Sequence, residues 1–449
     1  MADANGADLS QFSTWYSQAG TPRLEVESSY DADAQTFSLL FRQSCPPTPG
    51  QEDKKPFLLP IRMGLIGSES GKELPLNKEG ATDLVLRMTE TEQLFTFSNI
   101  TERPIPSLLR GFSAPVILTS DLSDEDRVFL VANDTDEFNR WEQLQALSRN
   151  LLLSLLEDYS AGKQLEMDTG LVEAIRKTIS NPQVDNDFKR CVLSLPGEGE
   201  ISEMVSPANP AAIHEVREFA VLSMVTALEG ELRQLFEECS TPAGEPFSPD
   251  PASMARRGLC NTSLGLLCKL KTDDMVLVAE RNYNIATNMT DSFAALAAAS
   301  SIQGPRREAM LTAFYKRWAE DPLVLNKWLS LQAGSNIPGN LANVQALLEH
   351  PAFDISNPNK VYSLLGGFCS SSVNFHAEDG SGYKFLADMI LKLDGMNAQV
   401  ASRMASPFTR WRKYDEVRAD KMHAQLQRIL AAKDNLSPNT FEIVSKSLE

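Results

Sequence analysis

The sequence predicts a multidomain chain, in which a small antiparallel β-sandwich precedes a large all-α domain of stacked antiparallel helix pairs, superhelical in form. Three observations support this. The chain has 449 residues, more than a single core of ordinary size requires. Apolar residues alternate with a period of two as far as about residue 118, and with a helical period after residue 123. We therefore expect a β-sandwich domain at 1–120 and a helical domain at 121–449.

The predicted strands lie between runs of turn-forming residues. Leu24 and Val26 alternate with charged residues, and the same period recurs along the first part of the chain. About seven short strands separated in this way are typical of a sandwich. The further alternating positions are Phe37, Leu39 and Phe41; Leu59, Ile61, Met63 and Leu65; Leu84, Leu86 and Met88; Phe95 and Phe97; and Val116 and Leu118.

Helices are predicted from Ser123 onward, where "SDEDR" forms a capping box of Ser123 with Asp126. Short breaks rich in proline, asparagine and glycine separate the helical segments, which favours antiparallel pairs stacked in sequence. Apolar residues on one helical face recur at Leu144, Leu147, Leu151 and Leu155; at Leu311, Phe314, Tyr315 and Trp318; and at Leu386, Met389, Ile390 and Leu393.

Composition narrows the class of protein. A formal charge of -18 repels nucleic acid and anionic membranes, and no apolar run is long enough to span a bilayer. The six cysteines form no C-x-x-C pair, which indicates free thiols in a reducing compartment. No signal peptide is visible at the start. We expect a cytoplasmic protein, or a plastid one if a transit peptide lies upstream, with neither nucleic acid nor membrane as partner.

The stretch "HEVRE" resembles half of a zinc site, since H-E-x-x-H on a helix brings two imidazoles to one face. Here Glu218 stands in place of the second histidine after His214. The ordinary alternative is an exposed, charged helix face. We favour that alternative, and we expect no metal site and no cofactor in this chain.

The stretch "NFHAEDGSGYKFL" places His376 close to Glu378 and Asp379, which is compatible with a general acid-base group. The alternative is a hinge, in which Asp379 and Gly380 form a turn and Ser381 caps the next helix. We favour the hinge and expect no catalytic residue here.

An ordered series of segments resembles the C-terminal half of the aminopeptidase N family, alanyl aminopeptidases of the gluzincin class. The segments are "FSTWYSQAGTPRLEV", "NDTDEFNRWEQLQ", "NMTDSFAALAA", "LVLNKWLSLQA", "FDISNPNKVYSLLGGF", "FHAEDGSGYKFLADMI" and "QVASRMASPFTRWRKYD". The resemblance implies the last two of the family's four domains, a β-sandwich and a helical domain, with a boundary near Ser120. The family's G-A-M-E-N and H-E-x-x-H motifs, which hold the substrate amine and zinc, are absent from this sequence.

The resemblance also implies two substrate-binding residues. In the family, the Gln of the Q-V-A-S-R segment lines the pocket for the first substrate side chain, and the Arg projects toward the substrate cavity. These correspond to Gln399 and Arg403, which are four residues apart and so share a helix face. The sequence departs from the family at Tyr362, where an Arg is frequent, and at Asn326 and Ala398.

We therefore expect the non-catalytic C-terminal portion of a zinc-dependent aminopeptidase N, which caps the active-site chamber and restricts it to peptides. Zinc belongs to the parent enzyme. The expected partners are peptide substrates and a catalytic domain, in the same parent chain or a separate one. The chain alone should have no peptidase activity. The alternative is a free-standing helical-repeat module that binds proteins or peptides without enzymatic activity.

Overall fold

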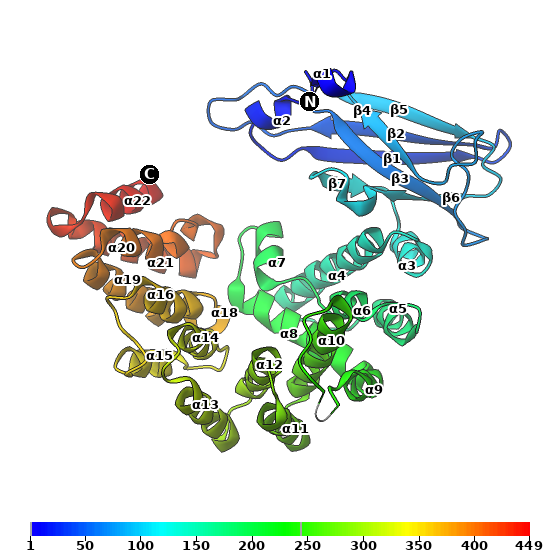
Figure 1. The fold of residues 1–449 in the computed structure, drawn as a ribbon. Helices are drawn as coiled ribbons and strands as arrows, with labels where there is room; N and C mark the ends of the chain where they lie inside the picture. Colours follow the sequence, from blue (N-terminus) through cyan, green and yellow to red (C-terminus); the bar gives the residue numbers. More distant parts are fainter. Residues whose placement is uncertain (1, 243–244) are drawn as a thin grey trace. The chain divides into compact units, whose positions relative to one another are not determined.

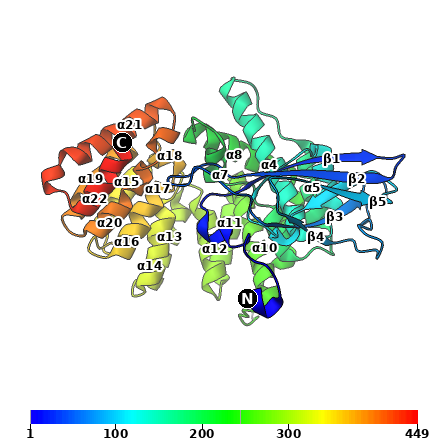
Figure 2. The same cartoon turned by 90° about the horizontal axis from the view of Figure 1, so that it is seen from above.

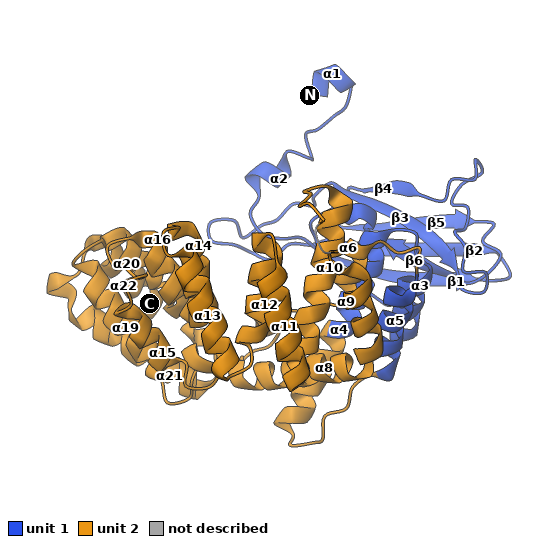
Figure 3. Cartoon of the chain, turned by 60° about the horizontal axis from the view of Figure 1, so that its bottom comes forward, with its two compact units in different colours: residues 1–148, 169–181 blue, residues 149–168, 182–449 orange. Residues whose placement is uncertain are grey.

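The structure, a computed structural model, describes residues 2–242 and 245–449 and divides into two compact units (Figure 3). Unit 1 contains the residues up to 148 together with 169–181, and unit 2 contains 149–168 and 182–449. Unit 1 therefore includes α3 (Asp124–Asn133), α5 (Thr169–Ser180) and the first half of α4 (Glu137–Ser160) in addition to the strands. The division of the sequence into domains at residue 120 stays a prediction.

Two sheets form the β part of unit 1 (Figure 1). One has the order β5-β2-β1-β7 and the other the order β4-β3-β6. Every paired strand is antiparallel to its neighbour except β7, which runs parallel to β1. The strands are β1 (Arg23–Asp31), β2 (Thr36–Ser44), β3 (Leu59–Gly67), β4 (Leu84–Met88), β5 (Glu92–Ser98), β6 (Pro104–Leu108) and β7 (Ile117–Ser120), preceded by α1 (Ala2–Asn5) and α2 (Thr14–Ser17).

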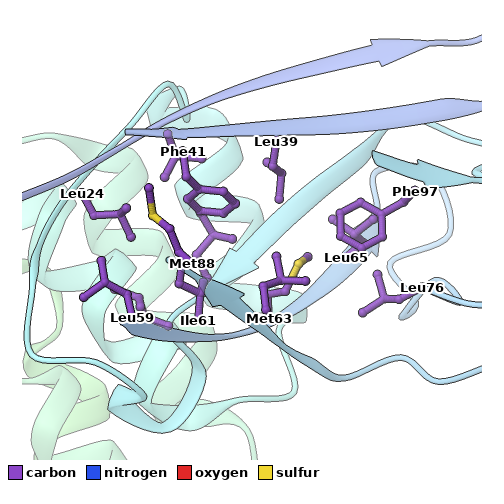
Figure 4. Close-up of a cluster of buried hydrophobic side chains, with 14 of the residues drawn as sticks. Leu24, Leu39, Phe41, Leu59, Ile61, Met63, Leu65, Leu76, Met88 and Phe97 are labelled. Carbon is purple, nitrogen blue, oxygen red and sulfur yellow. The ribbon is translucent and has the colours of Figure 1, made fainter. Parts of the chain in front are cut away.

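The core of the sandwich lies between these sheets, as the predicted alternation requires (Figure 4). Leu39 and Phe41 of β2 and Ile61 and Met63 of β3 are fully buried in it. The predicted small antiparallel sandwich is confirmed, with the parallel pairing of β7 as its one exception among the described strands.

Strand β6 was not among the positions that alternation identified, because Pro104 and Pro106 argue against a strand. The structure pairs β6 with β3 alone, at the edge of its sheet. A missing backbone N–H is tolerated there because one side of the strand has no partner strand.

A polar cluster around Arg110 lies buried in unit 1. Its Nε donates to Ser107 Oγ at 2.7 Å, Nη1 to Glu73 at 2.9 Å and Nη2 to Asp134 at 3.1 Å. Gly64 of β3 makes room for it, since a Cβ there would lie 2.3 Å from the guanidinium carbon. Burial raises the pKa of the Asp134 carboxyl, against the stabilising contacts with Ser107 and Arg110. The cluster fastens the loop before α4 to the sandwich.

Unit 2 is helical, and its helices follow one another in chain order, with α12, α13 and α14 side by side (Figures 1 and 2). This confirms the predicted helical domain. The helices are α6 (Asn186–Val192), α7 (Glu198–Met204), α8 (Pro210–Ala227), α9 (Glu229–Cys239), α10 (Pro251–Leu267), α11 (Asp273–Ile285), α12 (Met289–Ser300), α13 (Pro305–Trp318), α14 (Pro322–Ala333), α15 (Leu341–Leu348), α16 (Pro358–Val361), α17 (Gly367–Cys369), α18 (Ser372–Phe375), α19 (Ser381–Asp394), α20 (Ala398–Met404), α21 (Glu416–Ala431) and α22 (Pro438–Leu448).

The helix starts follow from the local sequence. Ser123 caps α3, its Oγ accepting from the N–H of Asp126, as predicted. Several helices of unit 2 begin with proline at the first position, where the absent N–H has no intrahelical partner to lose. Asn209, Asp250 and Asp321 cap three of these helices, each accepting a backbone N–H in the first turn.

Candidate functional site

Helix α20 carries both predicted substrate-binding residues. Asn397 caps the helix by accepting from the N–H of Val400 at 3.2 Å. Val400, Ala401 and Met404 are buried, and they hold the helix against its neighbours α19 and α22. Gln399 and Arg403 lie on the exposed side, one helical turn apart. A short helix anchored by its apolar face thus presents an amide and a guanidinium together.

Arg403 lies above the ring of Tyr362, with its guanidinium carbon 5.9 Å from the ring centroid. Tyr362 begins a π-helical segment, Tyr362–Gly366, which interrupts the helix between α16 and α17. A cation above an aromatic face is attracted by the ring quadrupole and is held in place without neutralising its charge. Within the described part of the chain, no carboxylate forms an ion pair with Arg403. Its charge is therefore open to an anionic ligand.

A small cavity of about 100 Å³ lies beneath the start of α20, lined by Asn397 and Val400. The remaining lining residues are Ile355, Ser356, Pro358, Leu393 and Met396. Its apolar members suit an aliphatic group better than a charged one.

His214 and Glu218, the first and last residues of "HEVRE", bind different partners. His214 Nδ1 is 2.8 Å from Glu198 Oε1, and Glu218 Oε1 accepts from Lys269 at 2.8 Å. The hydrogen bond to Glu198 raises the pKa of His214, more than burial lowers it. Over the residues that the structure describes, no three His, Cys, Asp or Glu side chains gather as metal ligands. His214 and Glu218 bind other side chains and do not form a set of ligands that fits zinc.

Glu198 was not singled out by its sequence. Its second carboxylate oxygen accepts from the hydroxyl of Ser372, so one side chain of α7 joins α8 to α18. Burial opposes ionisation, but the bonds from His214 and Ser372 hold the pKa of Glu198 below its usual value. Since the three residues are far apart in the sequence, no local pattern could have revealed the group. Glu198 has a structural role, because each of its two carboxylate oxygens is already hydrogen-bonded to a side chain of another helix.

His376 is half-buried and lies inside an aromatic group. Its Nδ1 is 2.8 Å from Tyr383 Oη, and its ring is 4.7 Å from that of Tyr414. Burial lowers the pKa of His376 to about 3, so the imidazole is neutral at physiological pH. Its carbonyl accepts from Arg418 at 2.9 Å. These contacts support the hinge and leave no accessible acid-base pair.

The hinge differs from the prediction in one detail. Gly380, with φ of 78°, occupies the N-cap position of α19, and Ser381 is the first helical residue. The side chain of Asp379 accepts from the N–H of Ser381 at 2.8 Å. The aspartate before the glycine therefore satisfies the helix start, whereas the serine was expected to do so.

None of the described helices combines the length and the apolarity that crossing a bilayer requires.

Both parts of the chain match known protein families. Residues 20–121 match the family DUF3458, described as a domain of unknown function with an Ig-like fold. Residues 124–449 match DUF3458_C, described as a domain of unknown function with ARM repeats.

Curated relatives match the whole chain. The aminopeptidase N of Escherichia coli (strain K12) is 36% identical over 450 residues, covering 100% of this chain and 51% of the relative. The aminopeptidase N of Caulobacter vibrioides is 38% identical over 450 residues, covering 100% of this chain and 50% of the relative. The chain thus spans about half the length of these relatives, and it corresponds to their C-terminal part.

A solved structure is similar to the whole chain. Legionella pneumophila aminopeptidase A in complex with aspartic acid superposes with a TM-score of 0.84 and 28% sequence identity. The similarity covers 100% of this chain and 51% of that one.

Proposed function

This chain belongs to the DUF3458_C family, and on that premise we propose that it is the non-catalytic C-terminal portion of a zinc-dependent aminopeptidase N. The observation that carries the proposal is the similarity to aminopeptidases N, which runs along the entire chain and covers about half of their length, the C-terminal part. The parent reaction is the removal of N-terminal amino acids from peptides. Zinc, the general base and the amine-binding carboxylate come from the catalytic half, because the described residues of this chain offer no matching set of ligands.

The role of the chain in the parent enzyme is to cap the active-site chamber and restrict it to peptides. Stacked helices suit this role, since a series of helices linked in chain order forms a wall that is rigid and extended. The capping surface includes the exposed side of α20.

Gln399 and Arg403 contribute to substrate binding in this proposal. Gln399 contacts the first substrate side chain, and Arg403 binds the C-terminal carboxylate of a short peptide. A guanidinium donates to both oxygens of a carboxylate at once. The support is that Arg403 is exposed, rests on Tyr362 and has no acidic partner among the described residues. Tyr362 orients the guanidinium where the family often has a second arginine, so the cavity carries less positive charge here.

The test joins this chain to the catalytic half of the Escherichia coli aminopeptidase N and compares an alanyl tripeptide with a neutral alanyl arylamide. The chain alone should cleave neither substrate. In the chimera, Arg403→Ala should lower kcat/KM for the tripeptide roughly tenfold or more, because one charge-assisted hydrogen bond is lost. The arylamide has no carboxylate and should be affected less. Gln399→Ala should change the preference for the first residue.

A matched control is Arg428→Ala, since Arg428 is already paired with Asp388 on the neighbouring helix α19. It should leave both substrates unaffected. Equal losses on tripeptide and arylamide would assign Arg403 a structural role and overturn its proposed contact. Cleavage by the chain alone, or a chimera no more active than the catalytic half, would overturn the proposed function and favour a free-standing binding module.

A further inference from the structure

Unit 2 contains a cavity of about 660 Å³ among helices α9, α10, α11 and α12. This volume is in the range of cavities that enclose a small organic molecule. The lining residues are Phe236, Glu237, Ser240, Thr241, Pro242, Glu245, Arg257, Cys260, Asn261, Val278, Arg281, Asn282, Ile285, Ala286, Thr287 and Asp291.

Arg257 is the unusual member of this lining. The residue is only 6% exposed, yet its Nε has no hydrogen-bond acceptor among the described residues. Its guanidinium carbon lies 4.6 Å from the ring centroid of Phe247, which holds the group by its face and leaves its N–H edge free. A buried guanidinium without an acceptor is costly, and such groups are rare in native proteins.

Two of the three acidic residues of the lining, Glu245 and Asp291, are engaged elsewhere. Glu245 forms an ion pair with Arg256. The two oxygens of Asp291 accept from the amides of Asn261 and Asn288, at 3.0 and 2.8 Å. The chain thus places carboxylates near Arg257 but binds them to other donors. The partner that Arg257 lacks must come from outside the described chain.

The remainder of the lining is largely apolar. Phe236, Val278 and Ala286 contribute to it, and Ile285 is 64% exposed although it is a large aliphatic residue. A second guanidinium, that of Arg281, is exposed in the same lining. An apolar wall with one buried cationic group suits a ligand of the same composition.

We propose that this cavity is a binding site for a small organic monocarboxylate with an apolar body. The carboxylate binds the free N–H edge of Arg257, and the body packs against Phe236, Val278 and Ile285. A single negative charge is favoured, because Glu237, Glu245 and Asp291 repel a dianion such as phosphate. The site does not depend on the proposed function of the chain.

The test uses 3-phenylpropanoate and its neutral analogue 3-phenylpropanamide, which differ only in the charged group. Titration calorimetry on the unsubstituted chain should show the acid binding at least about tenfold more tightly than the amide, as expected for a charge-assisted hydrogen bond in a buried setting. Methyl resonances of Ile285 and Val278 should shift on addition of the acid. This comparison requires no variant.

Substitution then tests the contact itself. Arg257→Met keeps an unbranched side chain that reaches to about the position of Nε but removes the donors, and it should abolish the preference for the acid. The control Arg233→Met removes one charge from α9, where Arg233 pairs with Glu229 and Asp274, outside the lining. It should leave binding unchanged. Equal affinity for acid and amide, shifts located at other methyl groups, or no binding up to the solubility limit would each overturn the proposal.

Discussion

Arg110 in unit 1 and Arg257 in unit 2 are both buried, but the two arginines differ in what surrounds them. Arg110 donates to a serine and three carboxylates, and a glycine makes room for it. Arg257 has an aromatic ring against its face and no acceptor for its Nε in the described chain. Burial alone therefore does not distinguish a structural charge from one available to a ligand. What distinguishes the two arginines is whether the N–H donors of the guanidinium have acceptors within the protein.

The physical basis is desolvation. A charge removed from water is stable in the fold only if protein groups replace the lost hydrogen bonds. Where the protein supplies them all, the charge is part of the scaffold. Where it does not, the fold tolerates a cost that binding can recover, so the unsatisfied group indicates a site.

The largest loss of stability should come from removing Arg110 from its cluster, in which the guanidinium nitrogens all have acceptors. Arg110→Met leaves the fully buried Asp134 carboxylate and Glu73 without their cation. Removing one partner of a buried pair typically costs about 3–5 kcal/mol. Hydrogen–deuterium exchange should show faster exchange of the amides of β3 and β6, and urea should unfold unit 1 at lower concentration.

The control for Arg110→Met lies in the same unit. Arg42 pairs with Glu27 and Glu92 at 2.6 Å, but 39% of its side chain is exposed and neither partner contacts Arg110. Arg42→Met should cost less than about 1 kcal/mol, as is usual for surface pairs. Equal destabilisation by the two substitutions would show that saturation of the buried cluster is not what stabilises unit 1.

An intermediate effect is expected at His214, a satisfied but titratable group of unit 2. His214→Phe removes a partner of Glu198 and should lower stability by about 1–3 kcal/mol. Because the pKa of His214 is raised above 6.5, its charged contribution is complete below that value and is lost as pH rises through the folded pKa. The pKa of Glu198 is lowered below 4.5, so its contribution is lost as pH falls through that folded value.

The stability difference between the parent chain and His214→Phe should therefore be larger at about pH 5.5 than at about pH 8.5. Urea unfolding midpoints at the two pH values measure it. His350 is a control of opposite sign, since burial lowers its pKa and its Nδ1 accepts from the N–H of Ala352 at 3.1 Å. Its contribution is lost as pH falls. The same pH trend in His350→Phe would refute the assignment.

The sequence predicted that a β part precedes a helical part, because the spacing of apolar residues along a strand or helix depends only on residues close together in the sequence. Alternation at Phe37 and Leu39 marks a buried strand face, and the capping serine at Ser123 marks a helix start. Strand β6 was missed because its prolines obey the local rule against strands, and only its edge position, a property of the whole sheet, makes them acceptable.

The candidate site could be predicted only in part. Resemblance identified Gln399 and Arg403, but the contact between Arg403 and Tyr362 joins residues 41 positions apart in sequence. Likewise, no pattern around Arg257 distinguishes it from the neighbouring Arg256, which is paired. Whether a donor is satisfied depends on distant segments, so it is visible only in the folded chain.

The smallest effect on stability should come from Arg257→Met, and it tests the comparison most directly. If Arg257 were a structural charge like Arg110, its loss would destabilise unit 2 by several kcal/mol. Since its Nε has no acceptor, the substitution removes a desolvated donor, and the only described contact it gives up is the cation–π contact with Phe247. Stability without ligand should change by less than about 1 kcal/mol, or rise. Urea unfolding of the chain, followed by exchange of the α10 amides, measures this. A loss as large as that of Arg110→Met would mean that Arg257 is satisfied within the fold, and the distinction between the two arginines would fail.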